Sequence, residues 1–364
     1  MYVKNIKLTN YRNYSELFLD FEKNANVFVG KNAQGKTNIV EALYILSTLK
    51  SFRNSKLNDC IKENEKSAII EAEVFVENFG SRKIKMIINK EGENQYFVNN
   101  NKLTKKSDMF GNLYSVIFSP DELFLIKGGP DVRREFLDLD ISQVSSSYVK
   151  LIERYETILL SRNKILKFNK NSKNIDTLLD VWDEQLALVG GQISIARQNF
   201  ILKLNDKAIE ATKFISDGRE NLKIDYICIE GETRQEKSDN ILKSLKANRL
   251  KDLELGYTTI GPHRDDLKFY INDKEVKPFA SQGQQRLVVL ALKLSELETI
   301  KNEYSAPILI LDDVFSELDK TRQINLSKYL VDNQIFITGT AVSKSNFFNC
   351  KKFRVTDAKV KISR

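Results

Sequence analysis

The stretch GKNAQGKT at residues 30–37 decides how the chain must fold around it. It matches the pattern GxxxxGK[ST] in full, a short apolar strand pattern at Asn26–Val29 leads into it, and an amphipathic helical pattern follows it. The backbone N–H groups of such a glycine loop, together with the N-terminus of the next helix, wrap phosphate oxygens. The sequence therefore predicts an α/β fold that binds a nucleotide.

The polar side chains of this loop have distinct expected roles. The Lys36 ammonium would neutralise charge on the β- and γ-phosphates during catalysis, and the Thr37 hydroxyl would ligate magnesium. We therefore expect ATP and Mg²⁺ as the cofactors. The expected nucleotide-binding residues of the loop are Gly30, Lys31, Asn32, Ala33, Gln34, Gly35, Lys36, Thr37 and Asn38.

A pair of acids far downstream is predicted to complete the site. The apolar run Ile308–Leu311 is typical of a buried strand, and Asp312 and Asp313 follow it directly. Ligands of α/β sheets bind at the carboxyl ends of the strands, so these acids would lie beside the phosphate loop. Asp312 would hold magnesium, directly or through water, and Asp313 would polarise the attacking water as a catalytic base.

Composition limits the other possibilities. The chain has 364 residues, of which 41% are hydrophobic and 29% charged, as in ordinary globular proteins. No apolar stretch approaches the roughly 20 residues of a membrane span, so we expect a cytoplasmic protein. Three dispersed cysteines and one histidine suggest neither a disulfide framework nor a zinc site. The net charge of +8 favours a polyanionic partner, although lysine-rich surfaces are often only solvated.

Periodicity divides the chain further. Period-two alternation from Ala68 to Val76 predicts an antiparallel side sheet. Helical periods from Ile141 to Ile165 and from Leu179 to Leu204 predict two long helices that fold back as a hairpin across a polar linker. We expect one discontinuous lobe with a mixed central sheet, the antiparallel side sheet and flanking helices, and an inserted helical lobe. The expected ranges are 1–130 and 255–364 for the first lobe and 131–254 for the second.

A third motif resembles the signature of ABC-type ATPases. Ser281, Gly283 and Gln284 stand at the start of a helical pattern, within a Ser-x-Gly-x-Gln sequence, shortly before the strand that ends in Asp312. Ser316–Asp319 then resembles the D-loop of the same ATPases. A serine hydroxyl and free N–H groups at a helix start can grip a second phosphate. The resemblance implies a head-to-tail pair of subunits that shares two ATP molecules across a two-fold interface.

Blocks along the whole chain resemble the RecF family of ABC/SMC-type ATPases. They are Asn10–Tyr14, Phe118–Leu123, Lys127–Pro130, Arg133–Asp138 and Gly261–Leu267. This resemblance implies an ATP-dependent DNA-binding protein of replication, recombinational repair and the SOS response, with weak, DNA-stimulated ATPase activity. It also implies ATP-dependent homodimers on duplex and gapped DNA, no dependence on base sequence, and cooperation with RecR and RecO in loading RecA.

The chain departs from the wider ABC pattern at two places. The second acid is Asp313 instead of glutamate, and residues 335–340 contain no histidine, so slow hydrolysis is expected. Thr338 and Thr340 are candidates for sensing the γ-phosphate, although a threonine in a strand is often structural. Arg12 would either reach the nucleotide or remain a surface residue. His263 is expected to pin a turn beside Pro262.

Other functions remain open on the sequence. The same ATP-binding architecture serves the energy subunits of membrane transporters and the ATPase subunits of SMC-like nuclease complexes. The absent histidine and the positive charge disfavour the transporter, and the absence of a CxxC motif in the insertion disfavours a zinc-hooked tether. The expected DNA phosphate contacts, which would equally suit a solvated face, are Lys50, Arg53, Lys56, Lys102, Lys105 and Lys106.

Overall fold

The computed structural model describes residues 1–53, 55–168, 174–314, 333–340 and 350–363, together with Leu326 and Leu330. The side chains of residues 302 and 303 are not described. Contacts divide the chain into two compact units. The first comprises Met1–Leu123, Glu210–Glu220 and Arg286–Arg364, and the second comprises Phe124–Ile209 and Asn221–Gln285. The Ser316–Asp319 segment, which resembles a D-loop, lies outside the described residues.

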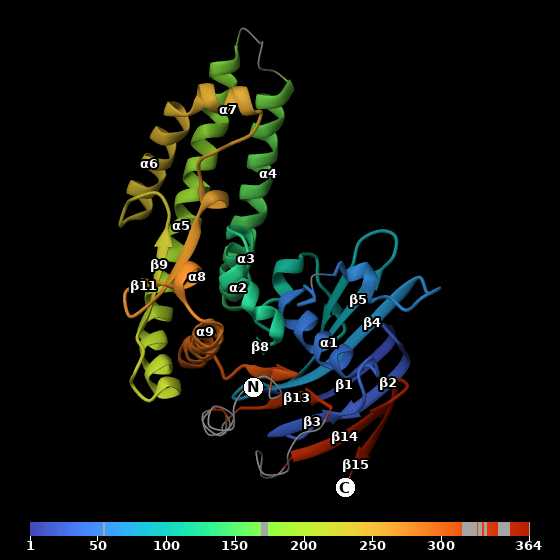
Figure 1. The fold of residues 1–364 in the computed structure, drawn as a ribbon. Coiled ribbons are helices and arrows are strands. Elements are labelled where there is room, and N and C mark those ends of the chain that lie inside the picture. The colour runs from blue at the N-terminus through green and yellow to red at the C-terminus, as the bar shows by residue number, and fades with distance from the viewer. Residues whose placement is uncertain are drawn as a thin grey trace. The chain divides into compact units, whose positions relative to one another are not determined.

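The first unit is built on a central sheet with strand order β15-β14-β3-β13-β12-β8 (Figure 1). All neighbouring pairs are parallel except β14 with β15. Strands buried on both faces read as continuous apolar runs, as in β12. The bounds are β3 Ala25–Val29, β8 Ser115–Phe118, β12 Ile308–Asp312, β13 Ile335–Gly339, β14 Cys350–Thr356 and β15 Lys359–Ser363.

A second, antiparallel sheet belongs to the same unit, with order β2-β1-β4-β5-β6-β7. Strand β4 alternates strictly between buried and half-buried residues, which confirms the predicted side sheet. Helix α1 (Lys36–Thr48) contacts strands of both sheets and is buried along nearly its whole length. The bounds are β1 Tyr2–Tyr11, β2 Tyr14–Asp20, β4 Ser67–Val76, β5 Gly80–Asn89, β6 Gln95–Val98 and β7 Asn101–Lys102.

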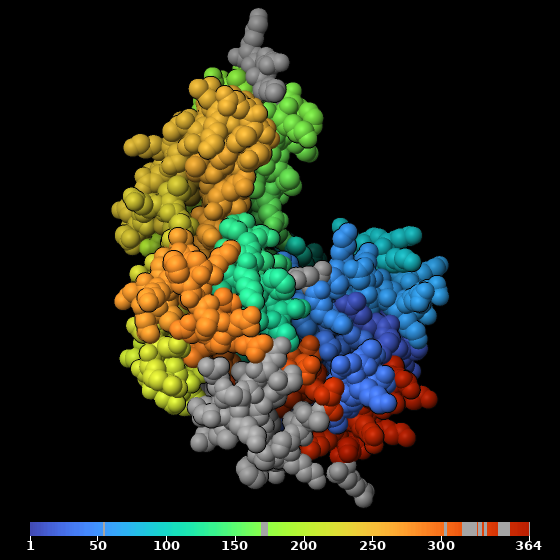
Figure 2. Space-filling view, in the orientation of Figure 1, coloured from blue at the N-terminus to red at the C-terminus, as the bar shows by residue number. Residues whose placement is uncertain are grey.

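Sequence-distant segments meet in this unit. In Figure 2 the first strands (blue) and the last strands (red) lie against each other, in agreement with the pairing of β14 with β3. Short helical turns fill the connections, and a long helix, α9, leads from the second unit into β12. The bounds are η1 Leu57–Cys60, η2 Lys106–Met109, η3 Pro120–Leu123 and α9 Gln282–Glu303.

The second unit is mainly helical, as predicted. Arg162 of α4 is fully buried, and its guanidinium donates to Asp183 of α5 at 2.6 Å and to Asp252 of α7 at 2.7 Å, so one cation joins three helices. The bounds are α2 Phe124–Lys127, α3 Pro130–Val144, α4 Ser146–Phe168, α5 Ile175–Ser216, β9 Leu222–Ile227, α6 Arg234–Ala247, α7 Arg249–Leu255, η4 Pro262–Arg264, β10 Asp266–Ile271, β11 Lys274–Glu275 and α8 Val276–Phe279.

The observed boundaries differ from the expected ones. Residues 255–285, expected with the α/β lobe, group with the helical unit. The reason is pairing: β10 forms an antiparallel sheet with β9, and α3 contacts β10. Residues 210–220, expected in the inserted lobe, group with the first unit instead.

His263, the only histidine of the chain, holds a turn of the second unit. Its Nε2 lies 3.0 Å from the carbonyl oxygen of Thr258, which can only accept, so Nε2 carries the proton. Nδ1 then accepts from the Tyr155 hydroxyl at 2.7 Å. Gly261 precedes it with φ 129°, and an added Cβ there would lie 2.4 Å from the Tyr155 hydroxyl. Burial lowers the pKa of His263 to about 4.

This depressed pKa predicts an acid-sensitive helical unit. The unfolded chain takes up a proton at His263 near the ordinary pKa of 6.5, whereas the folded chain resists protonation down to about 4. The contribution of neutral His263 to the free energy of unfolding is therefore complete above pH 6.5. It is lost as the pH falls toward 4, which lowers that free energy by about 3 kcal/mol. Urea unfolding followed by the fluorescence of Trp182, the single tryptophan, should show this loss. His263→Gln, which retains a donor and an acceptor, should flatten it, and equal pH dependence in both proteins would contradict the assignment.

Candidate nucleotide-binding site

The glycine loop joins β3 to α1 as the motif predicts. An added Cβ at Gly30 would lie 2.3 Å from the backbone oxygen of Val355 in β14, so the loop starts where only glycine fits. Gly35 caps α1 with φ 105°, a left-handed conformation that glycine adopts without strain. The loop therefore turns tightly enough to present its N–H groups and the start of α1 to one anion.

Lys36 points back over this loop. Its Nζ donates to the carbonyl oxygens of Gly30 at 2.9 Å and Lys31 at 2.8 Å, and the side chain is almost fully buried. Burial lowers the pKa of Lys36, while the carboxylates of Asp313 and Asp312 oppose that shift. The structure thus holds a compact cation above the loop, where phosphate charge would be neutralised.

Thr37 and Asp312 come together from 275 positions apart in the sequence. The Thr37 hydroxyl donates to Asp312 Oδ1 at 2.8 Å, and the Thr338 hydroxyl donates to the same oxygen at 2.5 Å. Burial raises the pKa of Asp312, although both hydroxyls counteract the rise. A hydroxyl and a carboxylate oxygen at this spacing are ligands that Mg²⁺ prefers, and a cation would offset the cost of the buried carboxylate, so the residues fit magnesium.

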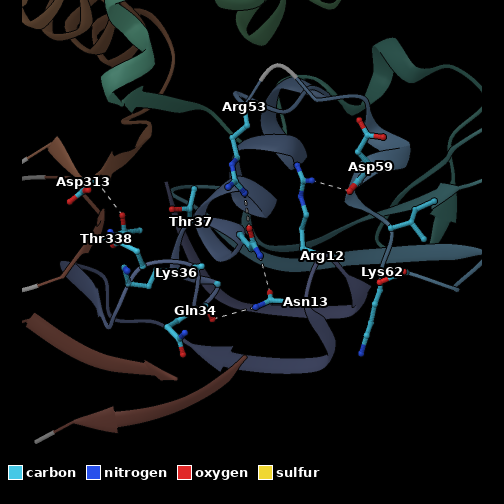
Figure 3. A pocket seen from close by; sticks show the side chains of 16 residues that line it. Arg12, Asn13, Gln34, Lys36, Thr37, Arg53, Asp59, Lys62, Asp313 and Thr338 are labelled. Atoms are coloured by element: carbon cyan, nitrogen blue, oxygen red, sulfur yellow. Dashed lines mark hydrogen bonds between the residues drawn. The ribbon is translucent and has the colours of Figure 1, made fainter. Parts of the chain in front are cut away.

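Asp313 adopts an unusual backbone conformation at the end of β12. Its φ is 57°, in the left-handed region, and its N–H donates to the Thr338 side-chain oxygen at 3.2 Å and to the Thr338 carbonyl oxygen at 3.3 Å. Figure 3 shows Asp313 beside Thr338 at the edge of the cavity. Aspartate tolerates this left-handed conformation better than most residues, and Asp313 directly follows the last residue of β12.

Thr338 therefore positions the acid pair, because the parallel register of β12 and β13 places it beside Asp312. The Thr338 hydroxyl donates to Asp312 and accepts from the N–H of Asp313, so its observed contacts are with the acid pair. Thr340, the other candidate γ-phosphate sensor, is exposed beyond the end of β13.

Replacing Thr338 tests this positioning role. Thr338→Val removes a hydrogen bond to a charged group, which contributes about 1.5–3 kcal/mol, so ATP hydrolysis should fall roughly tenfold to a hundredfold. Thr338→Ser keeps the hydroxyl and should retain most activity. Steady-state phosphate release and its dependence on magnesium concentration measure the effect. If the valine and serine variants hydrolyse ATP equally, the hydroxyl does not position Asp312.

Arg12 lines the cavity over the phosphate loop, and its guanidinium is hydrogen-bonded to Glu41, a residue that the sequence did not suggest. Its Nε and Nη2 donate to both carboxylate oxygens of Glu41, at 2.9 and 2.5 Å, and Nη1 donates to the carbonyl oxygen of Asp59 at 2.9 Å. Glu41 is fully buried in α1 and also accepts from the Tyr11 hydroxyl at 3.0 Å. This bidentate pair fixes Arg12 against the helix that carries Lys36 and Thr37. The sequence offered no signal for Glu41 except a lone acid on an apolar helix face.

The C-terminal hairpin also supports the loop. Gln34 Oε1 accepts from the backbone N–H of Asp357 at 2.6 Å, and Asp357 and Ala358 form the β14–β15 turn with φ of 47° and 56°. Asn13 donates to the Gln34 carbonyl oxygen at 3.3 Å. Two ends of the chain therefore hold the phosphate loop from outside.

A cavity of about 810 Å³ opens over these groups. Figure 3 shows Lys36, Thr37, Asp313 and Thr338 on one part of its wall, with Asp59 and Lys62 on another. Sequence reasoning missed this second wall, which also contains Ile61 and Glu63. Arg53, expected to contact DNA, also lines the cavity and donates to the Asn38 side chain at 2.8 Å. The other five expected DNA-contacting lysines are exposed.

The signature motif caps α9. The Ser281 hydroxyl accepts from the Gln284 N–H at 3.3 Å, while the Gln284 side chain accepts from the Ser281 N–H at 3.0 Å, which is a reciprocal capping box. Ser281, Gln282 and Gly283 are exposed. Because Ser281 and Lys36 belong to different units, a phosphate shared between these motifs remains a proposal.

Known proteins resemble this chain over nearly its full length. The family model for the RecF/RecN/SMC N-terminal domain matches residues 2–360. The DNA replication and repair protein RecF of Alkaliphilus oremlandii is 43% identical, with 93% of each chain covered, and that of Clostridium kluyveri is 41% identical, with 99% of each covered. A solved structure of the recombination mediator protein RecF with ATP, in the RecFOR pathway, superposes with a TM-score of 0.94 at 35% identity and covers 100% of this chain and 98% of its own. Among the described helices, none is long and apolar enough to cross a membrane.

Proposed function

The chain belongs to the RecF family, and from this premise we propose that it is an ATP-dependent DNA-binding protein of recombinational repair. ATP would pair two copies of the chain on DNA at single-strand gaps and at junctions of duplex and single strand. Slow, DNA-stimulated hydrolysis would release them. Cooperation with RecO and RecR in loading RecA is part of the proposal, supported by solved relatives that are described as members of the RecFOR pathway.

The observation that supports the nucleotide part is that Lys36 and Thr37 line one cavity while the Thr37 hydroxyl contacts Asp312 behind it. Thr37 and Asp312 would hold Mg²⁺, which would supply positive charge to neutralise the phosphates. Lys36 would hold the γ-phosphate, and Asp313 would orient water and accept its proton. Asn32, Ala33 and Gly35 line the cavity, where the N–H groups of the loop backbone would bind the phosphates.

A second subunit completes the proposed site. The exposed start of α9 offers Ser281, Gly283 and Gln284 as a separate phosphate grip. Transporter and nuclease ATPase subunits would use the same nucleotide chemistry. The RecF proteins are preferred because their similarity to this chain extends over nearly its full length.

Light scattering of the purified chain tests this function. We expect monomers with ADP, dimers with ATP, and dimers retained on gapped duplex DNA. A protein that stays monomeric with ATP and gapped DNA together would overturn the proposed pairing.

DNA binding itself should depend steeply on salt and not on base sequence. Phosphate neutralisation releases counterions, so a contact with about six phosphates would lose roughly a thousandfold in affinity between about 50 and 200 mM salt. Fluorescence anisotropy with duplexes of equal length and scrambled sequence measures both properties. A flat salt response, or a strong preference among the scrambled duplexes, would contradict phosphate-directed binding.

A further inference from the structure

A thiol and an amine meet in the helical unit, whereas the nucleotide cavity belongs to the first unit. Cys228 follows strand β9, and Lys237 lies in the first turns of α6. Lys237 Nζ donates to Cys228 Sγ at 3.1 Å and to the carbonyl oxygen of Ile229 at 2.6 Å. The lysine side chain is only 2% exposed, so this contact is not a chance encounter of surface chains.

The partners of this buried lysine are unusual. Among the described residues, no carboxylate forms an ion pair with Lys237; its acceptors are a thiol sulfur and a carbonyl oxygen. The Asp265 carboxylate interacts electrostatically with Lys237 without forming an ion pair, and Cys228 is the contacting group able to become an anion. The geometry therefore places a thiol and an amine, two groups that become nucleophiles on losing a proton, in direct contact.

The surrounding backbone holds the pair in place. Thr233 and Glu236 form a reciprocal capping box at the start of α6. Helix α6 packs closely on α5, since an added Cβ at Gly191 would lie 2.3 Å from the Ser238 hydroxyl. Gly231, with φ 135°, turns the connecting loop back so that Cys228 faces the helix. The two side chains thus stay within reach of each other.

Small molecules can reach the pair from solvent. Cys228 and Lys237 both line a cavity of about 710 Å³ in the helical unit, together with Tyr226, Asn205 and Leu202. Burial raises the pKa of the Cys228 thiol, and the Lys237 ammonium opposes this rise. The pKa of Cys228 stays above its ordinary value, but the lysine contact limits that rise and so increases the fraction of thiolate, the form that reacts with peroxides.

We propose that Cys228 and Lys237 form an oxidation site at which hydrogen peroxide produces a reversible sulfenamide cross-link. The Cys228 thiolate attacks one peroxide oxygen, the O–O bond breaks, and the departing hydroxide takes a proton from the Lys237 ammonium, so the products are sulfenic acid, water and the unprotonated Lys237 amine. The unprotonated Lys237 amine then attacks the sulfenic sulfur, the S–O bond breaks, and the hydroxyl leaves as water with a proton from nitrogen. Sulfur is oxidised by two electrons, and one peroxide is reduced to two waters. Two thiol molecules reverse the link by restoring Cys228 and Lys237 and forming their own disulfide.

Peptide mapping of the full chain tests the site. After peroxide treatment, blocking of free thiols and trypsin digestion without reductant, the peptide 224–234 should be joined to the peptide 235–243, because trypsin cannot cleave after a bridged Lys237. The mass should equal the two peptides less two hydrogens, and dithiothreitol should separate them and restore cleavage at Lys237.

Two variants and the other cysteines provide controls. Cys228→Ser should abolish the link, and Lys237→Arg should keep the positive charge but stop at the sulfenic acid. Peptides containing Cys60 or Cys350 should carry no lysine link under the same conditions. If the wild-type chain yields sulfinic acid or an intermolecular disulfide at Cys228 with Lys237 still cleavable, the proposal is wrong. A joined product that has gained an oxygen atom would likewise overturn the sulfenamide.

Discussion

Lys36→Arg is expected to reduce ATP hydrolysis by about a hundredfold or more while leaving the fold and much of the ATP affinity intact. The wild-type ammonium lies over the loop, within hydrogen-bonding distance of the carbonyl oxygens of Gly30 and Lys31. The wider, planar guanidinium cannot occupy that space as a point charge, so it would displace the charge from the γ-phosphate. The loop N–H groups that bind phosphate remain in the variant.

The measurements must separate binding from chemistry. Steady-state phosphate release gives the loss of hydrolysis, and titration with a fluorescent ATP analogue gives the affinity. Gln34→Ala is a useful comparison, because it removes the Asp357 contact outside the cavity and should weaken binding more than the chemical step. Unchanged hydrolysis in Lys36→Arg would remove the phosphate-loop assignment.

The nucleotide site was predictable because its chemistry is local. Backbone N–H groups of a glycine loop bind phosphate wherever strand, loop and helix follow in order, so residues 30–37 were sufficient. The acid pair required one further inference, that an apolar run ending in two acids is a strand whose carboxyl end lies at the ligand edge. In the structure the Thr37 hydroxyl donates to Asp312. The roles of Lys36, Thr37, Asp312, Asp313 and Ser281 toward nucleotide and magnesium remain proposals.

The supporting groups were not predictable, because they act through tertiary contacts. Glu41 lies on a helix that is buried between two sheets, where pattern analysis assigns apolar residues, and only the folded chain reveals that Arg12 pairs with it. The turn at Asp357 connects β14 to β15 and is formed because these strands pair. No sequence motif marks it. The unit boundary near residue 285 was missed for a similar reason, since the pairing of β9 with β10 joins segments about forty positions apart.

Ser281→Arg should abolish ATP-dependent pairing without preventing ATP binding by the single chain. Ser281 is exposed at the start of α9, where its hydroxyl accepts the Gln284 N–H. Arginine removes this cap, places a cation against the positive end of the helix dipole, and fills the space that a neighbour's triphosphate would enter. Light scattering with ATP should report monomers, whereas titration with the fluorescent analogue should report near wild-type affinity. Ser281→Thr keeps the hydroxyl cap and should still pair.

Mixing two defective proteins gives the decisive result. In a pair formed from one Ser281→Arg chain and one Lys36→Arg chain, the Ser281→Arg chain supplies an intact Lys36, and its partner supplies an intact Ser281. One of the two composite sites therefore contains both an intact Lys36 and an intact Ser281, and the other contains both substitutions. Partial recovery of hydrolysis in the mixture, absent from either protein alone, is expected only if each site draws one grip from each chain. A Ser281→Arg protein that pairs normally on its own with ATP would instead show that α9 does not contact the partner's nucleotide, and the shared-site mechanism would fall with it.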